Sequence, residues 1–147
     1  MRRLRMFLLA GVVFFLSFSC LVTAQDVPQA DPAQDQLIVI ATESWLGQVD
    51  QKDYEASWTN ASAYFKSMVA KDQWLVQLGA VRNPLGNTIS RTLWQKQRLA
   101  ALPGAPDGEY CVLTFNTVFA NKSGAVETIT MSKENDGQWR VIGYFIK

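Results

Sequence analysis

The chain has 147 residues, of which 48% are hydrophobic and 18% are charged, and its formal net charge is +1. This length and composition are typical of one globular domain and exclude a wholly disordered chain. The sequence contains no histidine, which excludes Ser-His-Asp and Cys-His catalysis, HExxH zinc sites and phosphoryl transfer through histidine. It also lacks a glycine-rich phosphate loop, a CxxC motif and a carboxylate cluster with metal-ligand spacing, so we expect no cofactor and no metal.

The first 24 residues have the pattern of a secretory signal. Three arginines among the first five residues precede an apolar run over 6–18, and small residues follow at 22–24. A basic start, a short apolar run and a small-x-Ala site predict export by a Sec-type signal with cleavage after Ala24. Two alternatives are a retained membrane anchor, for which the apolar run is short, and lipid attachment at Cys20, whose preceding residues fit a lipobox poorly.

Cleavage after Ala24 changes the charge and the cysteine content. The mature chain keeps 123 residues, and its net charge becomes −2 because three basic residues are removed and no acidic ones. No basic stripe survives, so we expect a periplasmic or secreted domain with no nucleic-acid partner and no membrane contact. Cys111 is then the only cysteine, which excludes an intramolecular disulfide, and its apolar neighbours predict a buried, unreactive thiol.

The N-terminal half of the mature chain predicts a lead-in followed by helices. Residues 25–35 hold prolines and few apolar side chains, so we expect a flexible lead-in before one domain over 36–147. A first helix is predicted near 36–50, with an apolar face formed by Leu37, Ile38, Ala41, Trp45 and Val49. A second helix, capped by Asp50 or Asp53, has an apolar face formed by Tyr54, Trp58, Ala61, Phe65 and Met68. A third helix, capped by Asp72 and ended by Pro84, has an apolar face formed by Trp74, Leu78 and Val81.

After Gly86 the sequence becomes rich in β-branched and aromatic residues, which predicts strands. The four expected strands are 88–99, 109–120, 125–133 and 138–146. Asp136-Gly137 predicts a two-residue loop between the last two strands. Helices followed by an antiparallel meander define an α+β domain, in which the helices lie across one face of a twisted four-stranded sheet.

Several blocks of the sequence resemble one bacterial family. They are YEASW at 54–58, RNPLG at 82–86, LPGAPDGEY at 102–110 and DGQWRVIGYFIK at 136–147. On these blocks the mature chain resembles the bacterial family known as domain of unknown function 4019. The resemblance implies bacterial origin and export, and it brings no assigned activity. The order of helices and sheet is similar to the cone-shaped folds of the nuclear transport factor 2-like and cystatin-like group.

Two charged residues interrupt apolar faces of the predicted sheet. The Asp136-Gly137 loop sets a register in which Glu127 lies on an apolar face. The predicted pairs of that register are Glu127 with Ile146, Ile129 with Tyr144, and Met131 with Ile142. On the first strand Arg91 alternates onto one face with Ile89 and Leu93.

An unpaired buried charge is costly, so we expect Arg91 and Glu127 to form an ion pair. One hypothesis is that this pair is structural. The other is a ligand pocket between sheet and helices, with polar groups and aromatic walls. The residues of that pocket would be Arg91, Glu127, Tyr144, Tyr54 and Trp58.

Three functions fit these residues. The favoured one is a non-catalytic module that binds a small ligand or a protein, because a neighbouring guanidinium makes a carboxylate a weaker base. The first alternative is a small lyase or isomerase with Glu127 as general base. The second is a self-associating structural module, a homodimer through the sheet.

The five tryptophans suggest an aromatic or carbohydrate-binding platform, but four of them fit core-facing positions, which favours core packing. Trp94 is the exception, because it is predicted on the outer face of its strand beside Lys96 and Arg98. It marks a partner surface there or, as the favoured alternative, packs under the loop over 102–108.

Overall fold

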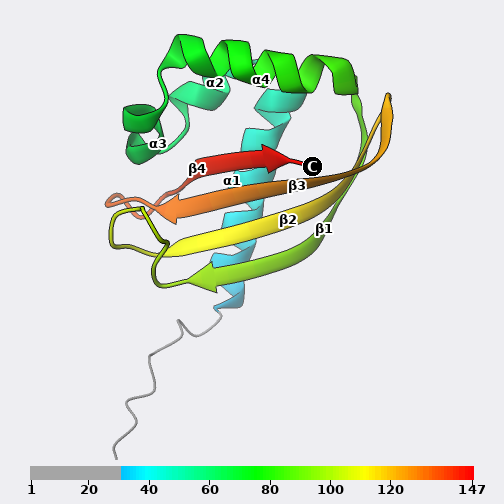
Figure 1. Cartoon of the computed structure of the whole chain (residues 1–147). Helices are drawn as coiled ribbons and strands as arrows, with labels where there is room; N and C mark the ends of the chain where they lie inside the picture. The colour runs from blue at the N-terminus through cyan, green and yellow to red at the C-terminus, as the bar shows by residue number, and fades with distance from the viewer. Residues whose placement is uncertain (1–30) are drawn as a thin grey trace, which may run out of the picture.

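The computed structural model describes residues 31–147, and the predicted signal over 1–24 lies outside the described residues. Helices precede strands along the chain (Figure 1), which confirms the predicted α+β class. The helices are α1 (Pro32–Asp50), α2 (Tyr54–Thr59), α3 (Ala63–Met68) and α4 (Lys71–Leu85). The strands are β1 (Thr88–Leu99), β2 (Tyr110–Phe119), β3 (Lys122–Lys133) and β4 (Trp139–Ile146).

The strands form one antiparallel sheet in the order β1-β2-β3-β4, which is the predicted meander. In Figure 1, α1 crosses one face of the sheet, while α2, α3 and α4 lie beyond the β4 edge. The core lies between this face and the helices, and Ile38, Leu46, Phe115 and Ile129 are fully buried in it. No described helix covers the opposite face, which we call the outer face (Figure 1).

Helix α1 begins earlier than predicted, within the expected lead-in. Asp31 caps it by accepting a hydrogen bond from the backbone N of Ala33 at 3.0 Å, and Pro32 occupies the first turn. Proline is favourable there because its missing N–H has no partner in a helix start. The buried face consists of Ile38, Thr42, Trp45, Leu46 and Val49. Leu37, predicted on that face, is 60% exposed.

The predicted second helix is two short helices. The backbone leaves the helical path at Asn60, and the Ser62 hydroxyl accepts a hydrogen bond from the backbone N of Phe65 at 2.9 Å, which starts α3. The Ser62 N–H also donates to the Val141 carbonyl of β4 at 2.9 Å. The break therefore joins α3 to the sheet by a hydrogen bond. Met68, which is predicted on the buried face of the second helix, is exposed.

Helix α4 differs from the prediction at both ends. It begins at Lys71 without a side-chain cap, so the predicted cap at Asp72 is wrong. It also continues through Pro84, because a proline in the last turn removes few intrahelical hydrogen bonds. Asn121 satisfies the free carbonyls of this turn: its side-chain amide donates to Pro84 and its backbone N–H donates to Leu85, both at 3.0 Å.

The β3–β4 hairpin reaches the predicted register by a different path. Two predicted residue pairs are confirmed, Ile129 with Tyr144 and Glu127 with Ile146. The third is wrong, because Met131 pairs with Val141 and Ile142 is an extra residue in β4. The loop is one residue longer than a two-residue turn, since the Glu134 backbone N–H donates to the Gln138 carbonyl. The β-bulge at Ile142 cancels this shift, so Glu127 still faces the helices.

A second bulge changes the alternation of β1. Trp94 is an extra residue there, and the strand beyond it turns Lys96 and Arg98 toward the helices. Both then pair with Asp35 of α1, at 2.7 Å and 2.8 Å respectively. The prediction that these two residues share a face with Trp94 is therefore wrong. Trp94 itself is 66% exposed and does not pack under the loop over 102–108.

Replacing the Ser62 cap tests the role of the helix break. We expect Ser62→Ala to lower the free energy of unfolding by about 1 kcal/mol, because the first turn of α3 loses its hydrogen-bond acceptor. Urea denaturation measures this change. Ser67→Ala, on the exposed side of α3, is the control, and equal losses in the two variants would contradict the capping role.

Candidate functional site

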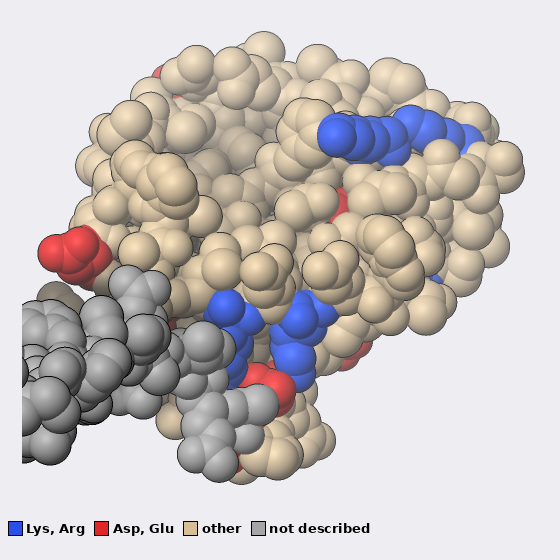
Figure 2. All heavy atoms as spheres, turned by 60° about the horizontal axis from the view of Figure 1, so that its bottom comes forward, with Lys and Arg blue, Asp and Glu red and all other residues tan. Residues whose placement is uncertain are grey.

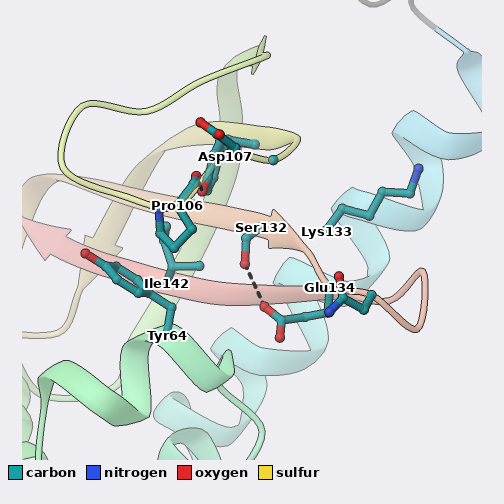
Figure 3. A pocket seen from close by; sticks show the side chains of 10 residues that line it. Tyr64, Pro106, Asp107, Ser132, Lys133, Glu134 and Ile142 are labelled. Atoms are coloured by element: carbon teal, nitrogen blue, oxygen red, sulfur yellow. Dashed lines mark hydrogen bonds between the residues drawn. The ribbon is translucent and has the colours of Figure 1, made fainter.

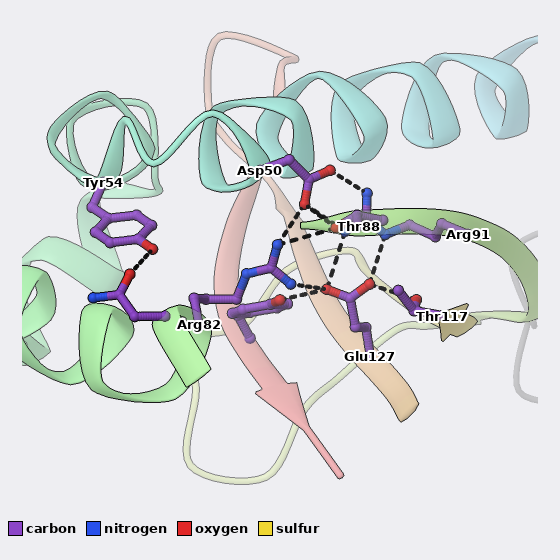
Figure 4. A network of polar contacts seen from close by, with 9 residues as sticks. Asp50, Tyr54, Arg82, Thr88, Arg91, Thr117 and Glu127 are labelled. Carbon is purple, nitrogen blue, oxygen red and sulfur yellow. Dashed lines mark hydrogen bonds and ion pairs between the residues drawn. The ribbon is translucent and has the colours of Figure 1, made fainter. Parts of the chain in front are cut away.

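Arg91 and Glu127 form the predicted ion pair. Arg91 Nε donates to Glu127 Oε2 at 2.6 Å, and one terminal nitrogen of Arg91 donates to Oε1 at 3.2 Å. Glu127 on β3 is 0% exposed, and Arg91 on β1 is 14% exposed. Both side chains point to the helix-covered face of the sheet (Figure 4).

The remaining hydrogen bonds to Glu127 come from the strands on either side of β3. Thr117 on β2 donates its hydroxyl to Oε2 at 2.6 Å, and the Tyr144 hydroxyl on β4 donates to Oε1. A buried carboxylate needs such donors, because it has lost its water. The two oxygens of Glu127 are thus held by side chains from three different strands.

Two charged residues from the helices complete the site, as Figure 4 shows. Asp50, at the end of α1, accepts hydrogen bonds from Arg91 and Arg82 at 2.7 Å each and from Thr88 at 2.8 Å. Arg82 of α4 is 4% exposed, and its second terminal nitrogen lies 3.6 Å from Glu127 Oε1. We call Asp50, Arg82, Arg91 and Glu127 the ionic cluster.

The ionic cluster is formally neutral, because two guanidinium groups face two carboxylates. Burial raises the pKa of Asp50, but the hydrogen bonds from Arg91 and Thr88 outweigh burial, so this pKa lies below its ordinary value. Burial lowers the pKa of Arg91, and the bonds to Asp50 and Glu127 more than reverse that effect. Burial and the charge of Glu127 both raise the pKa of Tyr144, which keeps its donating proton.

The sequence analysis missed Arg82 and Asp50 as members of the site. Arg82 lies four residues after Leu78, on the same helix face, yet Val81 is the residue predicted to complete that face. In the structure Val81 is 49% exposed and Arg82 is buried against the Phe119 ring, 4.5 Å from its centroid. The one sequence signal for Arg82 is its position in step with the apolar stripe of Trp74 and Leu78, and Val81 fits the same stripe equally well.

The structure brings three of the five proposed pocket residues together, namely Arg91, Glu127 and Tyr144. The other two, Tyr54 and Trp58, lie on α2 and have partners elsewhere. The Tyr54 hydroxyl donates to Asn83 at 3.2 Å, and the Trp58 indole donates to the Val69 carbonyl at 2.8 Å. Ile89, predicted beside Arg91, is 67% exposed, because a register shift makes it an extra residue in β1.

Open space lies instead around the β3–β4 hairpin. A cleft of about 220 Å³ separates this hairpin from α3 and from the loop after β1 (Figure 3). Its wall includes Tyr64, Pro106 and Ile142. Two polar groups in it already have partners within the protein: Ser132 donates to Glu134 at 3.1 Å, and Lys133 pairs with Glu109 at 2.8 Å.

The described residues show few features of a nucleic-acid-binding surface, a metal site or a membrane-spanning helix. Lys and Arg side chains form separate groups on the face shown in Figure 2, not a continuous stripe. Within residues 31–147 no cluster of three or more His, Cys, Asp or Glu is placed to hold a metal ion. No helix in that range is long and apolar enough to span a membrane. Cys111 is buried, as predicted, and burial raises the pKa of its thiol.

Fold and site together define an α+β domain with helices on one face of a four-stranded meander and a closed ionic cluster between the layers. Residues 41–144 match the family described as Protein of unknown function (DUF4019). The chain belongs to this family, which confirms the resemblance found in its sequence blocks. No characterised protein matches the chain in sequence. The likeness to the nuclear transport factor 2-like and cystatin-like folds stays a prediction.

Breaking the ionic cluster tests its structural role. We expect Glu127→Gln and Arg91→Met each to lower the free energy of unfolding by about 3–5 kcal/mol, because each leaves a charge buried without its partner. Tyr144→Phe, which keeps the charges, should lower it by about 1–3 kcal/mol.

Chemical denaturation measures these losses. Lys71→Met is the matched control, because it removes an exposed ion pair with Glu55, and such pairs contribute about 0–1 kcal/mol. Similar small losses in the cluster variants and in this control would contradict a structural role.

The lowered pKa of Asp50 predicts an acid dependence of stability. Below about pH 4 the unfolded chain binds a proton at Asp50 more readily than the folded chain does, so the free energy of unfolding falls as the pH falls. We expect Asp50→Asn to reduce this dependence between about pH 6 and about pH 3. Urea denaturation across this range checks it, with the exposed Asp72→Asn as control. An unchanged slope in Asp50→Asn would show that Asp50 does not contribute.

Proposed function

We propose that this chain is an exported bacterial domain that binds a ligand or partner without chemical turnover, and that the ionic cluster is its structural centre. The observation that carries this proposal is the state of Glu127. Its side chain is 0% exposed, and hydrogen bonds from Arg91, Thr117 and Tyr144 occupy both oxygens. A general base needs a free lone pair within reach of its substrate. The engagement of Glu127 therefore supports binding over the lyase or isomerase alternative.

Export and a periplasmic or secreted location are also part of the proposal. Their support is the basic, apolar and small-residue pattern over 1–24, which is typical of a cleaved signal. Bacterial origin rests on the family resemblance. The clefts beside the β3–β4 hairpin are the contact region that we favour, because both are open spaces lined by aromatic and polar side chains.

A second candidate function is self-association through the outer face of the sheet. Trp94 is 66% exposed and Phe145 is 55% exposed, at opposite edge strands of the sheet. Exposed aromatic side chains on a face that no described helix covers are typical of interaction surfaces. This candidate is a homodimer with the ionic cluster unchanged inside each copy.

Purification of the exported chain from its native host tests the proposed function. We expect native mass spectrometry to show one copy of the chain with a retained small molecule or partner. Backbone amide signals of Asn135 and Gln138 should move when that molecule is titrated into the emptied protein, because both lie at the clefts. The Arg91 signal should stay in place as the internal control.

Two outcomes would overturn the proposal. A stable homodimer that retains nothing would favour self-association. Conversion of a host metabolite that is lost in Glu127→Gln, with the fold intact by circular dichroism, would favour the enzyme.

A further inference from the structure

A second cleft near the hairpin, of about 250 Å³, lies between α1 and the start of β4. Helix α1 contributes Ser44, Trp45 and Gln48 to it from one helical face, and Trp139 of β4 also lines it. Asn60 and Gln138 lie at its polar walls. We call this space the α1–β4 cleft. It is spacious enough for one sugar-sized ring, and no residue of the ionic cluster lines it.

Four uncharged amide and hydroxyl side chains of the α1–β4 cleft have no partners within the described part of the chain. Ser44, Gln48, Asn60 and Gln138 make no side-chain hydrogen bond there, and the buried Gln48 Oε1 atom accepts no hydrogen bond from a donor. Buried polar atoms are nearly always hydrogen-bonded in folded proteins, so an unpartnered one calls for an explanation. The cleft beside Tyr64 differs in this respect, because none of its lining residues has a buried polar atom without a hydrogen-bond partner.

The α1–β4 cleft also carries no unbalanced charge. Arg140 lines it, but its guanidinium makes two hydrogen bonds to Asp136, at 2.9 Å and 2.7 Å. The bonds from Arg140 and from the Gln138 backbone lower the pKa of Asp136 to about 2. The pair therefore stays ionised and neutral overall at physiological pH, and the cleft gives no reason for a charged ligand to bind.

We propose that the α1–β4 cleft binds a neutral, hydroxyl-rich ring of the sugar class, an assignment that rests on the proposed binding function. Three amides and a hydroxyl offer both donors and acceptors, which suits the hydroxyl groups of a sugar. The Trp139 indole offers apolar surface to the C–H groups of the ring. An adjoining groove shares Asn60 and Arg140 with the cleft, so a second ring has room beside the first.

A titration of the exported chain with glucose, N-acetylglucosamine and cellobiose tests this proposal, with the tryptophan indole N–H signals as the readout. We expect the Trp139 signal to move saturably, and cellobiose to bind more tightly than glucose. The Trp58 and Trp74 indoles should stay in place, because they donate to Val69 and Ser57 within the protein. The exposed Trp94 indole reports non-specific contact.

Variants separate the cleft from the rest of the surface. Asn60→Ala and Gln138→Ala should each weaken binding about three- to tenfold through the loss of a hydrogen bond. Ser44→Leu should abolish binding by filling the cleft, since Ser44 is exposed and its replacement leaves the core intact. Gln95→Ala on β1 is the matched control and should bind as the unmodified chain does, with melting temperatures confirming that every variant is folded.

The outcomes distinguish this inference from the proposed function. If no sugar moves the Trp139 signal, or if Trp94 moves equally, the sugar assignment is wrong. If a molecule retained from the host or the neutral peptide triglycine then moves Trp139, the binding function stands with a different ligand class. If nothing binds anywhere and nothing is retained, both proposals fail.

Discussion

A buried carboxylate needs hydrogen-bond donors from the protein itself, and most elements of this fold supply or position donors for Glu127. Its donors come from β1, β2 and β4. Arg91 is shared with Asp50 at the end of α1, and Arg82 extends the ionic cluster to α4. Losing a single partner would strand a buried charge. The relative positions of both layers therefore depend on this one side chain.

The same demand explains where a function can reside in this molecule. The space between sheet and helices is where a fold of this kind could hold a ligand, and here the apolar core and the ionic cluster fill it. Open clefts whose walls carry polar side chains lie instead at the hairpin end of the molecule, beside Tyr64 and beside Gln48. A closed ionic cluster in the interior and open clefts at the hairpin end are consistent with a domain that binds a ligand or a partner at its edge.

Much of the fold was predictable from the sequence, because strand alternation and turn residues are local signals. The meander followed from the turn residues, and the Arg91–Glu127 pair followed from strand alternation, the hairpin register and the cost of an unpaired buried charge. The hairpin loop is one residue longer than predicted and the bulge at Ile142 adds one residue to β4, so the two errors in the predicted register cancel at Glu127. The contributions of Asp50 and Arg82 were not predictable in this way. Which face of a helix is buried depends on its partner, so the helical period could not decide between Val81 and Arg82. The bulge at Trp94 was also not predictable, because no turn residue in the sequence indicates it.

The chain distances within the ionic cluster have a kinetic consequence. Arg91 is 41 residues from Asp50 and 36 residues from Glu127, so these ion pairs close long loops of the chain. Loop-closure entropy delays such contacts until local structure has formed. The charges therefore keep their water until the helices and the three pairs of adjacent strands are present, and their desolvation is a late step on the folding path. During unfolding this order is reversed, so water enters the ionic cluster at an early step.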